Sequence, residues 1–418
     1  MCKIIINGGR RLDGSTAVQG AKNSVLPILA ATVLADGECT VMGCPNLSDV
    51  NAAIEILEYL GCKVWREGST VTVNPQAVSC ADIPDSLMRK MRSSVTFLGA
   101  VTARCKRAKI SSPGGCELGP RPIDLHIKAL RELNISVTEH GGYTETFAEN
   151  MRGADIHLDF PSVGATENAM LAAVTAKGTT TINNAAKEPE ICDLEDFLKK
   201  MGAKISGAGT GVIKIEGTPK LHGAEHRVIP DRIAASTYLC AAAMAGGTLE
   251  LTDVLPRHLN AVTAVLKDTG AEIRTKKNSM VLKASGRVRS IDTLRTMPYP
   301  GFPTDAQAPM TALLSVANGT SVIIENIFEN RYKHCAQLCK MGADIKVNGR
   351  IAVICGVREL TGSTVCAQEL RGGAALCIAG AAARGVTEIS GVNYIERGYE
   401  DIVKDFSRLG VEIKKQIS

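Results

Sequence analysis

Six stretches of this chain, about 70 residues apart, share one pattern. Each has a polar or charged start, an Ala-rich apolar segment typical of a buried helix, and a β-prone run. They span residues 20–43, 93–111, 164–184, 232–253, 304–326 and 370–391. We expect their helices to end near Gly37, Lys106, Gly178, Gly247, Gly319 and Gly385, which are 69, 72, 69, 72 and 66 residues apart. This fixed period indicates a repeat architecture, which limits the fold more than any single motif does.

Two further markers define the content of one repeat and the way the chain closes. A helix end, a Gly or Asn and a strand recur at 57–64, 130–137, 198–205, 266–273, 338–345 and 406–413. One repeat is therefore helix, strand, helix, strand and a further strand. The pattern I-x-I-x-G-x-x-x-L-x-G occurs at 4–14 and 213–223. Because the last repeat begins near Leu370 and has only 49 residues, we expect the first 20 residues to supply its missing strand.

The six repeats divide into two sets of three. One expected domain is 21–229, and the other is 1–20 together with 230–418. Two crossings of the chain, near 20–21 and 229–230, would join them. A double linker of this kind allows two lobes to close on a ligand that binds between them.

Composition narrows the functional classes. Of 418 residues, 45% are hydrophobic and 22% are charged, which is typical of globular proteins. The net charge of +5 is too small to indicate nucleic-acid binding, but it suits small anionic substrates. The 14 Cys and 7 His residues show no metal-ligand spacing, so we expect no metal and a reducing, cytoplasmic setting. Because no signal-peptide pattern is visible and no apolar run reaches the roughly 18 residues of a membrane span, we expect no membrane insertion.

Polar residues recur where the six Ala-rich helices should begin. They are Lys22 and Asn23, Arg92, Ser162, Asp231 and Arg232, Asp305, and Arg371. Helix capping explains the Ser and Asp residues, because these are ordinary N-cap types. Capping does not explain the cations, because positive charge is unfavourable at a helix N-terminus. Their repetition indicates a polyanionic ligand bound at these helix starts.

A loop rich in Gly and Pro, SSPGGCELGPRP at 111–122, contains Cys116. We expect this Cys to be exposed, unlike Cys240 and Cys377 in apolar helices. Arg121 would lower the pKa of its thiol if the guanidinium points towards it. A chance surface Cys is the alternative interpretation.

Three other loops carry candidate residues. In YPGFPTDAQAPM at 299–310, Asp305 is either a helix N-cap or a general base for a hydroxyl. In NIFENRYKH at 326–334, Glu329 and Arg331 are substrate-binding candidates, and an exposed salt bridge is the simpler interpretation. Arg397 lies in a loop before a helix. Neither a Walker motif nor a G-x-G-x-x-G motif after a strand is present.

Taken together, these stretches resemble the enolpyruvyl transferases over the whole chain. The resemblance is carried by LDGSTAVQGAKNSVLPILAA, SSPGGCELGPRPIDLH, PSVGATENAMLAA, YPGFPTDAQAPMTAL, FENRY, LRGGAAL and ERGYEDI. It implies an α/β fold of two inside-out, barrel-like lobes, each with three repeats around buried helices. Ser48 and Phe160 stand where some members carry Lys, which changes the expected contacts to a diphosphate.

The resemblance also implies an activity. We expect the enolpyruvyl group of phosphoenolpyruvate to be transferred to the 3′-hydroxyl of UDP-N-acetylglucosamine by addition and elimination, with release of phosphate and without a cofactor. This reaction is the first committed step of peptidoglycan biosynthesis. A shikimate-pathway member is one alternative, but that enzyme lacks the Gly-Gly-Cys loop. A non-catalytic paralogue that binds nucleotide sugar is the other, and the presence of Lys22, Cys116, Asp305 and Arg397 in one chain disfavours it.

Roles follow from the resemblance residue by residue. Cys116 resembles the proton donor to C3 of phosphoenolpyruvate, the site of its covalent adduct and the target of fosfomycin. Asp305 resembles the base at the sugar hydroxyl. Residues that resemble phosphoenolpyruvate-site residues are Lys22, Asn23, Arg121 and Arg397. Residues that resemble nucleotide-sugar contacts are Arg92, Arg121, Pro122, Ile123, Asp124, Leu125, Ser162, Val163, Gly164 and Ile327. Glu329, Arg331 and Arg371 complete the candidate substrate-binding set.

Overall fold

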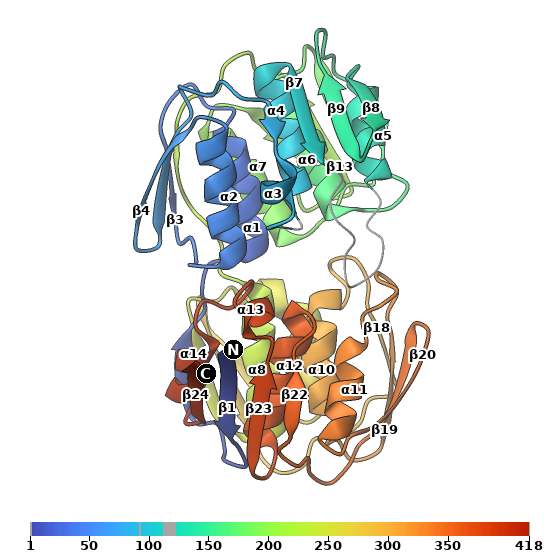
Figure 1. Ribbon diagram of the computed structural model, residues 1–418. Helices are drawn as coiled ribbons and strands as arrows, with labels where there is room; N and C mark the ends of the chain where they lie inside the picture. The colour runs from blue at the N-terminus through green and yellow to red at the C-terminus, as the bar shows by residue number, and fades with distance from the viewer. Residues whose placement is uncertain (1, 92, 112–122, 418) are drawn as a thin grey trace. The chain divides into compact units, whose positions relative to one another are not determined.

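The computed structural model describes residues 2–91, 93–111 and 123–417. Within these, the chain forms two compact units. The first unit contains residues 20–111 and 123–229, and the second contains 2–19 and 230–417. The chain passes between the units at 19–20 and again at 229–230 (Figure 1).

The first unit contains three four-stranded sheets, one for each repeat. Their strand orders are β14-β3-β5-β4, β6-β7-β9-β8 and β10-β11-β13-β12. The helices are α1 (Lys22–Thr32), α2 (Ser48–Tyr59), α3 (Asp85–Met88), α4 (Phe97–Cys105), α5 (Asp124–Glu132), α6 (Val163–Ala173), α7 (Pro189–Lys200) and the 3₁₀ helix η1 (Ser94–Thr96). The strands are β3 (Cys39–Met42), β4 (Lys63–Glu67), β5 (Thr70–Asn74), β6 (Asp82–Ile83), β7 (Arg107–Ser111), β8 (Ser136–His140), β9 (Tyr143–Phe147), β10 (Asp155–His157), β11 (Thr179–Asn183), β12 (Lys204–Ser206), β13 (Val212–Glu216) and β14 (Glu225–Arg227).

The second unit repeats this plan, with sheets β16-β17-β15-β2, β18-β19-β21-β20 and β22-β23-β1-β24. The helices are α8 (Arg232–Ala245), α9 (Asn260–Asp268), α10 (Gln307–Leu314), α11 (Lys333–Lys340), α12 (Leu370–Ala382), α13 (Val392–Ile395), α14 (Ile402–Arg408) and the 3₁₀ helices η2 (Pro256–Leu259) and η3 (Thr304–Ala306). The strands are β1 (Cys2–Asn7), β2 (Gly14–Ala17), β15 (Gly247–Thr252), β16 (Glu272–Thr275), β17 (Ser279–Ala284), β18 (Thr293–Arg295), β19 (Thr320–Ile324), β20 (Asp344–Asn348), β21 (Ile351–Cys355), β22 (Thr364–Cys366), β23 (Val386–Ser390) and β24 (Glu412–Ile417).

The Ala-rich helices form the core of each unit, and the sheets lie around them (Figure 1). In the second unit α8, α10 and α12 pack against one another, and in the first unit α4 packs against α1 and α6. Small side chains allow these helices to approach closely, and nearly every residue of α8 and α12 is buried. The expected fold, with helices inside and sheets outside, is confirmed.

The N-terminal segment belongs to the second unit. β1 is antiparallel to both β23 and β24, with Ile4 opposite Ile389 and Ile6 opposite Ile413. β1 therefore lies inside the sheet of the sixth repeat, between β23 and β24. β2, whose pairing was not predicted, is parallel to β15 of the fourth repeat.

Two expectations about the repeat are wrong in detail. α1, α6 and α10 each end five residues before the Gly expected to cap them, because the chain leaves each helix through tighter turns. After α1, for example, the N–H of Ala35 donates to the carbonyl of Thr32. Each sheet also has a fourth strand, parallel to its neighbour, that was not predicted. β10, β14 and β18 have only three residues, too few to show a strand pattern.

No helix within 2–91, 93–111 and 123–417 combines the length and the apolar character that crossing a lipid bilayer requires.

Candidate functional site

Four of the predicted site residues, Arg92, Cys116, Arg121 and Pro122, lie outside the described residues. The other predicted residues fall into three groups: the start of α1, the starts of α5 and α6, and a cluster in the second unit around Asp305.

Lys22 is the first residue of α1, as predicted, and it is buried. Its Nζ lies 2.6 Å from Oδ2 of Asp49, a buried carboxylate in the first turn of α2. Asp49 therefore offsets a cation that both burial and the helix dipole disfavour. The next residue, Asn23, is half-buried. No sequence pattern singles out Asp49, because an acidic residue in the first turn of a helix is common.

Asp193 of α7 anchors the same helix start. Its Oδ2 accepts a hydrogen bond from the hydroxyl of Ser24 and another, at 3.1 Å, from the N–H of Ile229. The other lies 2.8 Å from Nε2 of His226. The first turn of α1 is thus tied to the segment that leads out of the first unit.

The starts of α5 and α6 bring together the predicted nucleotide-sugar residues of the first unit. Asp124 is exposed at the first position of α5, between half-buried Ile123 and Leu125. Ser162 caps α6, as its residue type predicted, by accepting the N–H of Ala165 at 3.4 Å. Val163 and Gly164 follow it and are half-buried. Because α5 packs against α6, the two predicted segments belong to one local structure.

The two residues that stand in place of Lys are both exposed: Ser48 begins α2, and Phe160 lies two residues before the α6 cap.

In the second unit, Asp305 lies between two buried arginines. Its Oδ1 is 2.5 Å from Nη2 of Arg331, and its Oδ2 is 3.3 Å from Nη2 of Arg371. Both arginine side chains are 2% exposed, whereas the Asp305 side chain is 27% exposed. The N-cap of η3 is Pro303, so the alternative role of Asp305 as a helix cap is wrong.

Electrostatics keep both arginines charged. Burial acts to lower the pKa of Arg331, but the carboxylates of Asp305, Glu369 and Glu325 outweigh it and raise that pKa. Burial likewise acts to lower the pKa of Arg371, and the neighbouring Tyr399 and Asp305 raise it. The cluster therefore presents two desolvated cations around one partly exposed carboxylate.

Tyr399 contacts Arg371 through both its hydroxyl and its ring. Nη1 of Arg371 donates to the Tyr399 hydroxyl at 3.2 Å, and the guanidinium carbon lies 5.4 Å from the centre of the ring. The same hydroxyl is 2.6 Å from Oγ1 of Thr237 in α8. Sequence reasoning missed Tyr399 and Thr237. These two residues are 162 positions apart along the chain, and no local pattern links them.

The remaining candidates of the second unit differ in exposure. Glu329 forms an exposed salt bridge, as the simpler interpretation expected, but its Oε1 lies 3.5 Å from Nη2 of Arg350 and not beside Arg331, which is buried. Ile327 is half-buried, and its N–H donates to Oε1 of Glu325 at 2.8 Å. Arg397 is half-buried in the turn between α13 and α14, as predicted.

Arg232 begins α8 after Asp231, which caps the helix as its residue type predicted. Its guanidinium carbon lies 5.5 Å from the centre of the Tyr299 ring. The cations at the starts of α1, α8 and α12 therefore all contact other protein side chains.

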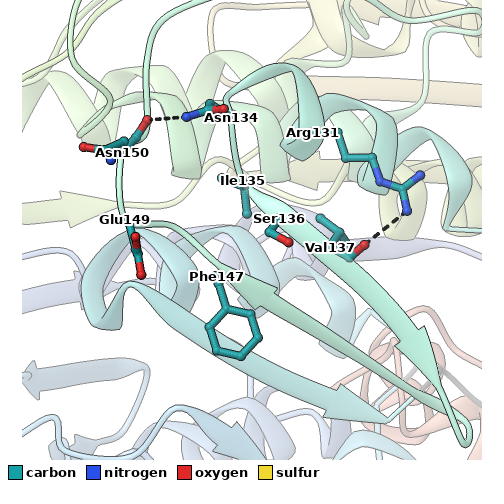
Figure 2. A pocket seen from close by; sticks show the side chains of 8 residues that line it. All are labelled: Arg131, Asn134, Ile135, Ser136, Val137, Phe147, Glu149 and Asn150. Atoms are coloured by element: carbon teal, nitrogen blue, oxygen red, sulfur yellow. Dashed lines mark hydrogen bonds between the residues drawn. The ribbon is translucent and has the colours of Figure 1, made fainter.

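A surface hollow of about 610 Å³ lies elsewhere, beside the end of α5 and the β8–β9 hairpin (Figure 2). Arg131 and Asn134 line it and donate to the carbonyls of Val137 and Asn150, respectively. None of the predicted site residues that the structure describes lines this hollow. In the part of the chain that the structure describes, no group of three or more His, Cys, Asp or Glu side chains is arranged to hold a metal ion.

Comparisons with known proteins agree with this arrangement. Residues 6–406 match the family model described as EPSP synthase (3-phosphoshikimate 1-carboxyvinyltransferase). The chain is 52% identical over 413 residues to UDP-N-acetylglucosamine 1-carboxyvinyltransferase 2 of Caldanaerobacter subterraneus, covering 99% of both chains. It is 47% identical to UDP-N-acetylglucosamine 1-carboxyvinyltransferase 1 of Carboxydothermus hydrogenoformans, covering 99% of this chain and 98% of the relative.

Solved structures show the same fold. The enolpyruvyl transferase NikO from Streptomyces tendae has a TM-score of 0.90 at 24% identity, covering 100% of this chain and 99% of that one. EPSP synthase from Acinetobacter baumannii has a TM-score of 0.76 at 18% identity, covering all of both chains. The family model and the full-length relatives together show that this chain belongs to the enolpyruvyl transferase family, among the UDP-N-acetylglucosamine 1-carboxyvinyltransferases.

Proposed function

We propose that this protein transfers the enolpyruvyl group of phosphoenolpyruvate to the 3′-hydroxyl of UDP-N-acetylglucosamine, in the cytoplasm, as the first committed step of peptidoglycan synthesis. The observation that carries the proposal is the identity of 46–52% over the whole chain to relatives named for this activity. The family model alone is named for the shikimate-pathway reaction, so these relatives favour the nucleotide-sugar substrate.

The reaction needs a base, an acid and charge compensation. The sugar hydroxyl adds to C2 of phosphoenolpyruvate as its proton passes to a base, for which we propose Asp305. A second proton reaches C3, for which we propose Cys116 as donor. Loss of the C3 proton and of phosphate from C2 then restores the double bond. Each proton taken up is later released, so the balance needs no cofactor.

The cluster around Asp305 supports the role of base. The exposed fraction of the Asp305 side chain leaves it accessible to a hydroxyl, while Arg331 and Arg371 hold both of its oxygens in place. A general base must be fixed within hydrogen-bond reach of the proton that it abstracts. Lys22, Arg121 and Arg397 are proposed to compensate the charges of the phosphate and carboxylate of phosphoenolpyruvate. Asn23 is proposed to donate hydrogen bonds to the same substrate.

Phosphate release from phosphoenolpyruvate tests the proposal. We expect release with UDP-N-acetylglucosamine and none when 3-phosphoshikimate replaces it. Release only with 3-phosphoshikimate would assign the shikimate-pathway reaction. Calorimetric binding of UDP-N-acetylglucosamine without any release would instead indicate a non-catalytic binding protein.

A further inference from the structure

We propose that His126 and Asn168 are positioning residues that set the spacing between the two nucleotide-sugar segments, 123–125 and 162–164. This inference rests on the proposed function, because that function assigns the two segments to UDP-N-acetylglucosamine. Neither His126 nor Asn168 was among the predicted site residues.

Asn168 connects three helices through its side-chain amide. Its Oδ1 accepts the N–H of Gly99 in α4 at 2.7 Å. Its Nδ2 donates to Nδ1 of His126 in α5 at 3.0 Å and to the carbonyl of Gly164 in α6 at 3.3 Å. Because a backbone N–H can only donate, Oδ1 must face Gly99, and the orientation of the amide is fixed.

The amide in turn fixes the imidazole. Since Nδ2 of Asn168 only donates, Nδ1 of His126 must be the acceptor, and the ring proton resides on Nε2. His126 is 8% exposed and Asn168 is fully buried. Burial, opposed by Asp124, lowers the pKa of His126 to about 4, so the ring is neutral near pH 7.

The imidazole contacts the start of α6. A Cβ added to Gly164 would lie 2.9 Å from Cε1 and 3.2 Å from Nε2 of His126. A distance of 2.9 Å is too short for two non-bonded carbons, so only a glycine at position 164 lets the start of α6 lie this close to the ring. The His126 ring in turn limits how closely α6 can approach α5. The ring therefore acts as a spacer between the first turn of α5 and the first turn of α6.

The same pairing recurs in the second unit. His334 of α11 precedes Gly372 of α12 by 38 residues, the interval that separates His126 from Gly164. A Cβ on Gly372 would lie 3.0 Å from Cβ of His334, which is 3% exposed. This pair lies beside Arg371, as the first lies beside the predicted nucleotide-sugar residues. A buried histidine beneath the next helix start thus occurs once in each unit, on α5 and on α11.

The test measures the calorimetric Kd and the KM of UDP-N-acetylglucosamine, and the KM of phosphoenolpyruvate, in the full-length protein. For His126→Ala and Asn168→Ala we expect the nucleotide-sugar constants to rise on the order of tenfold, because displacing positioned groups by about 1 Å has effects of this size or larger. We expect the KM of phosphoenolpyruvate to change less than twofold. The milder His126→Asn keeps an acceptor for Asn168 and serves if His126→Ala does not fold.

A second-site comparison separates spacing from general stability. Gly164→Ala alone should weaken nucleotide-sugar binding, because its methyl group collides with the ring. Gly164→Ala combined with His126→Ala removes the collision, so the double variant should bind no worse than His126→Ala. Thr102→Val is the matched control, because it removes a buried 2.7 Å hydrogen bond between α4 and β9 in the same unit.

The outcomes are distinct. Three results would overturn the inference. The first is a Kd in the double variant that rises by the product of the two single effects. The others are equal rises in both KM values, or a Thr102→Val profile like that of His126→Ala. A wild-type protein that binds the nucleotide sugar but releases no phosphate would contradict the proposed function alone, and the Kd series would still test the spacing.

Discussion

At the level of single residues, Asp305 combines a structural and a chemical demand. Its carboxylate forms ion pairs with two arginines whose side chains are 2% exposed. Removing the negative charge would leave two buried positive charges less compensated. The same carboxylate is the proposed base. One substitution should therefore affect both stability and turnover.

Asp305→Asn tests both effects. We expect turnover to fall by about 10² or more, the usual contribution of a general base. We also expect the free energy of unfolding to fall by about 1–3 kcal/mol, because a charge-assisted hydrogen bond is lost. Turnover assays and urea unfolding measure these changes. Glu388→Gln is the control, since its exposed pair with Lys3 should contribute less than about 1 kcal/mol. Wild-type turnover in Asp305→Asn would exclude it as the base.

Cys116 lies outside the described residues, and its role is tested by its chemistry. A thiol of ordinary pKa about 8.5 keeps its proton for much of the time near neutral pH and is also a strong nucleophile. Cys116→Ser supplies a much weaker acid, so turnover should collapse. Cys116→Asp keeps an acid but loses the nucleophile, so we expect activity with resistance to fosfomycin and an acid-shifted pH optimum.

Turnover against pH, with and without fosfomycin, measures both Cys116 variants. Full activity of Cys116→Ser, or alkylation mapped to another cysteine, would contradict the assignment.

Sequence reasoning located Lys22 and Arg371 at helix starts but could not give their partners. Position within a repeat follows from local pattern, because helix starts have characteristic residue types. Partners such as Asp49 and Tyr399 lie on other elements, and no local pattern encodes them. The cations were attributed wholly to a ligand, whereas part of their compensation comes from the protein.

At the level of elements, the Ala-rich helices could be predicted because their composition is distinctive and their period is regular. Their exact ends could not, since α1 leaves through i→i−3 turns that no cap residue announces. The short parallel strands such as β10 were missed because three residues make no periodic pattern. Their pairing depends on the neighbouring strand rather than on their own sequence.

The buried histidines of α5 and α11 make stability depend on pH. Burial lowers the pKa of His126 to about 4 and that of His334 to about 3, from an ordinary value of 6.5. Between pH 6.5 and these lowered pKa values, the unfolded chain binds more protons than the native state. The stability that they contribute is therefore present above about pH 6.5 and is lost as the pH falls towards 4.

Urea unfolding at pH 7 and pH 5 measures this effect. We expect each histidine to account for on the order of 1–2 kcal/mol of the decrease. A variant with both His126→Asn and His334→Asn should lose less stability than the wild type over the same interval. An equal loss in both proteins would show that these histidines are not the groups that resist protonation.

At the level of the whole molecule, the period of the repeats predicted how the chain closes. The 49-residue final repeat lacked a strand, and β1 supplies it between β23 and β24. The pairing brings Cys2 opposite Ile417, so the two ends of the chain lie on adjacent antiparallel strands (Figure 1). The second unit is therefore continuous in space but interrupted in sequence.

This continuity predicts how fragments of the second unit fold. A fragment of residues 230–418 lacks β1 and β2, so β24 loses its only partner strand, and β23 and β15 each lose one of their two partners. It should remain unfolded or aggregate, because unpaired strand edges promote association. Joining residues 1–19 after residue 418 through a Gly-rich turn restores both strands. A short turn suffices, since β24 and β1 form an antiparallel pair whose ends meet at Ile417 and Cys2.

Circular dichroism and thermal unfolding of the two fragments decide the matter. We expect a cooperative transition only in the permuted fragment. A matched permutant in which Ile4 and Ile6, both buried in β1, are replaced by Asp should lose that transition, because two charges would enter the core. Equal cooperativity in the fragment without residues 1–19 would show that the N-terminal strands are dispensable to this unit, despite their central and edge positions in its sheets.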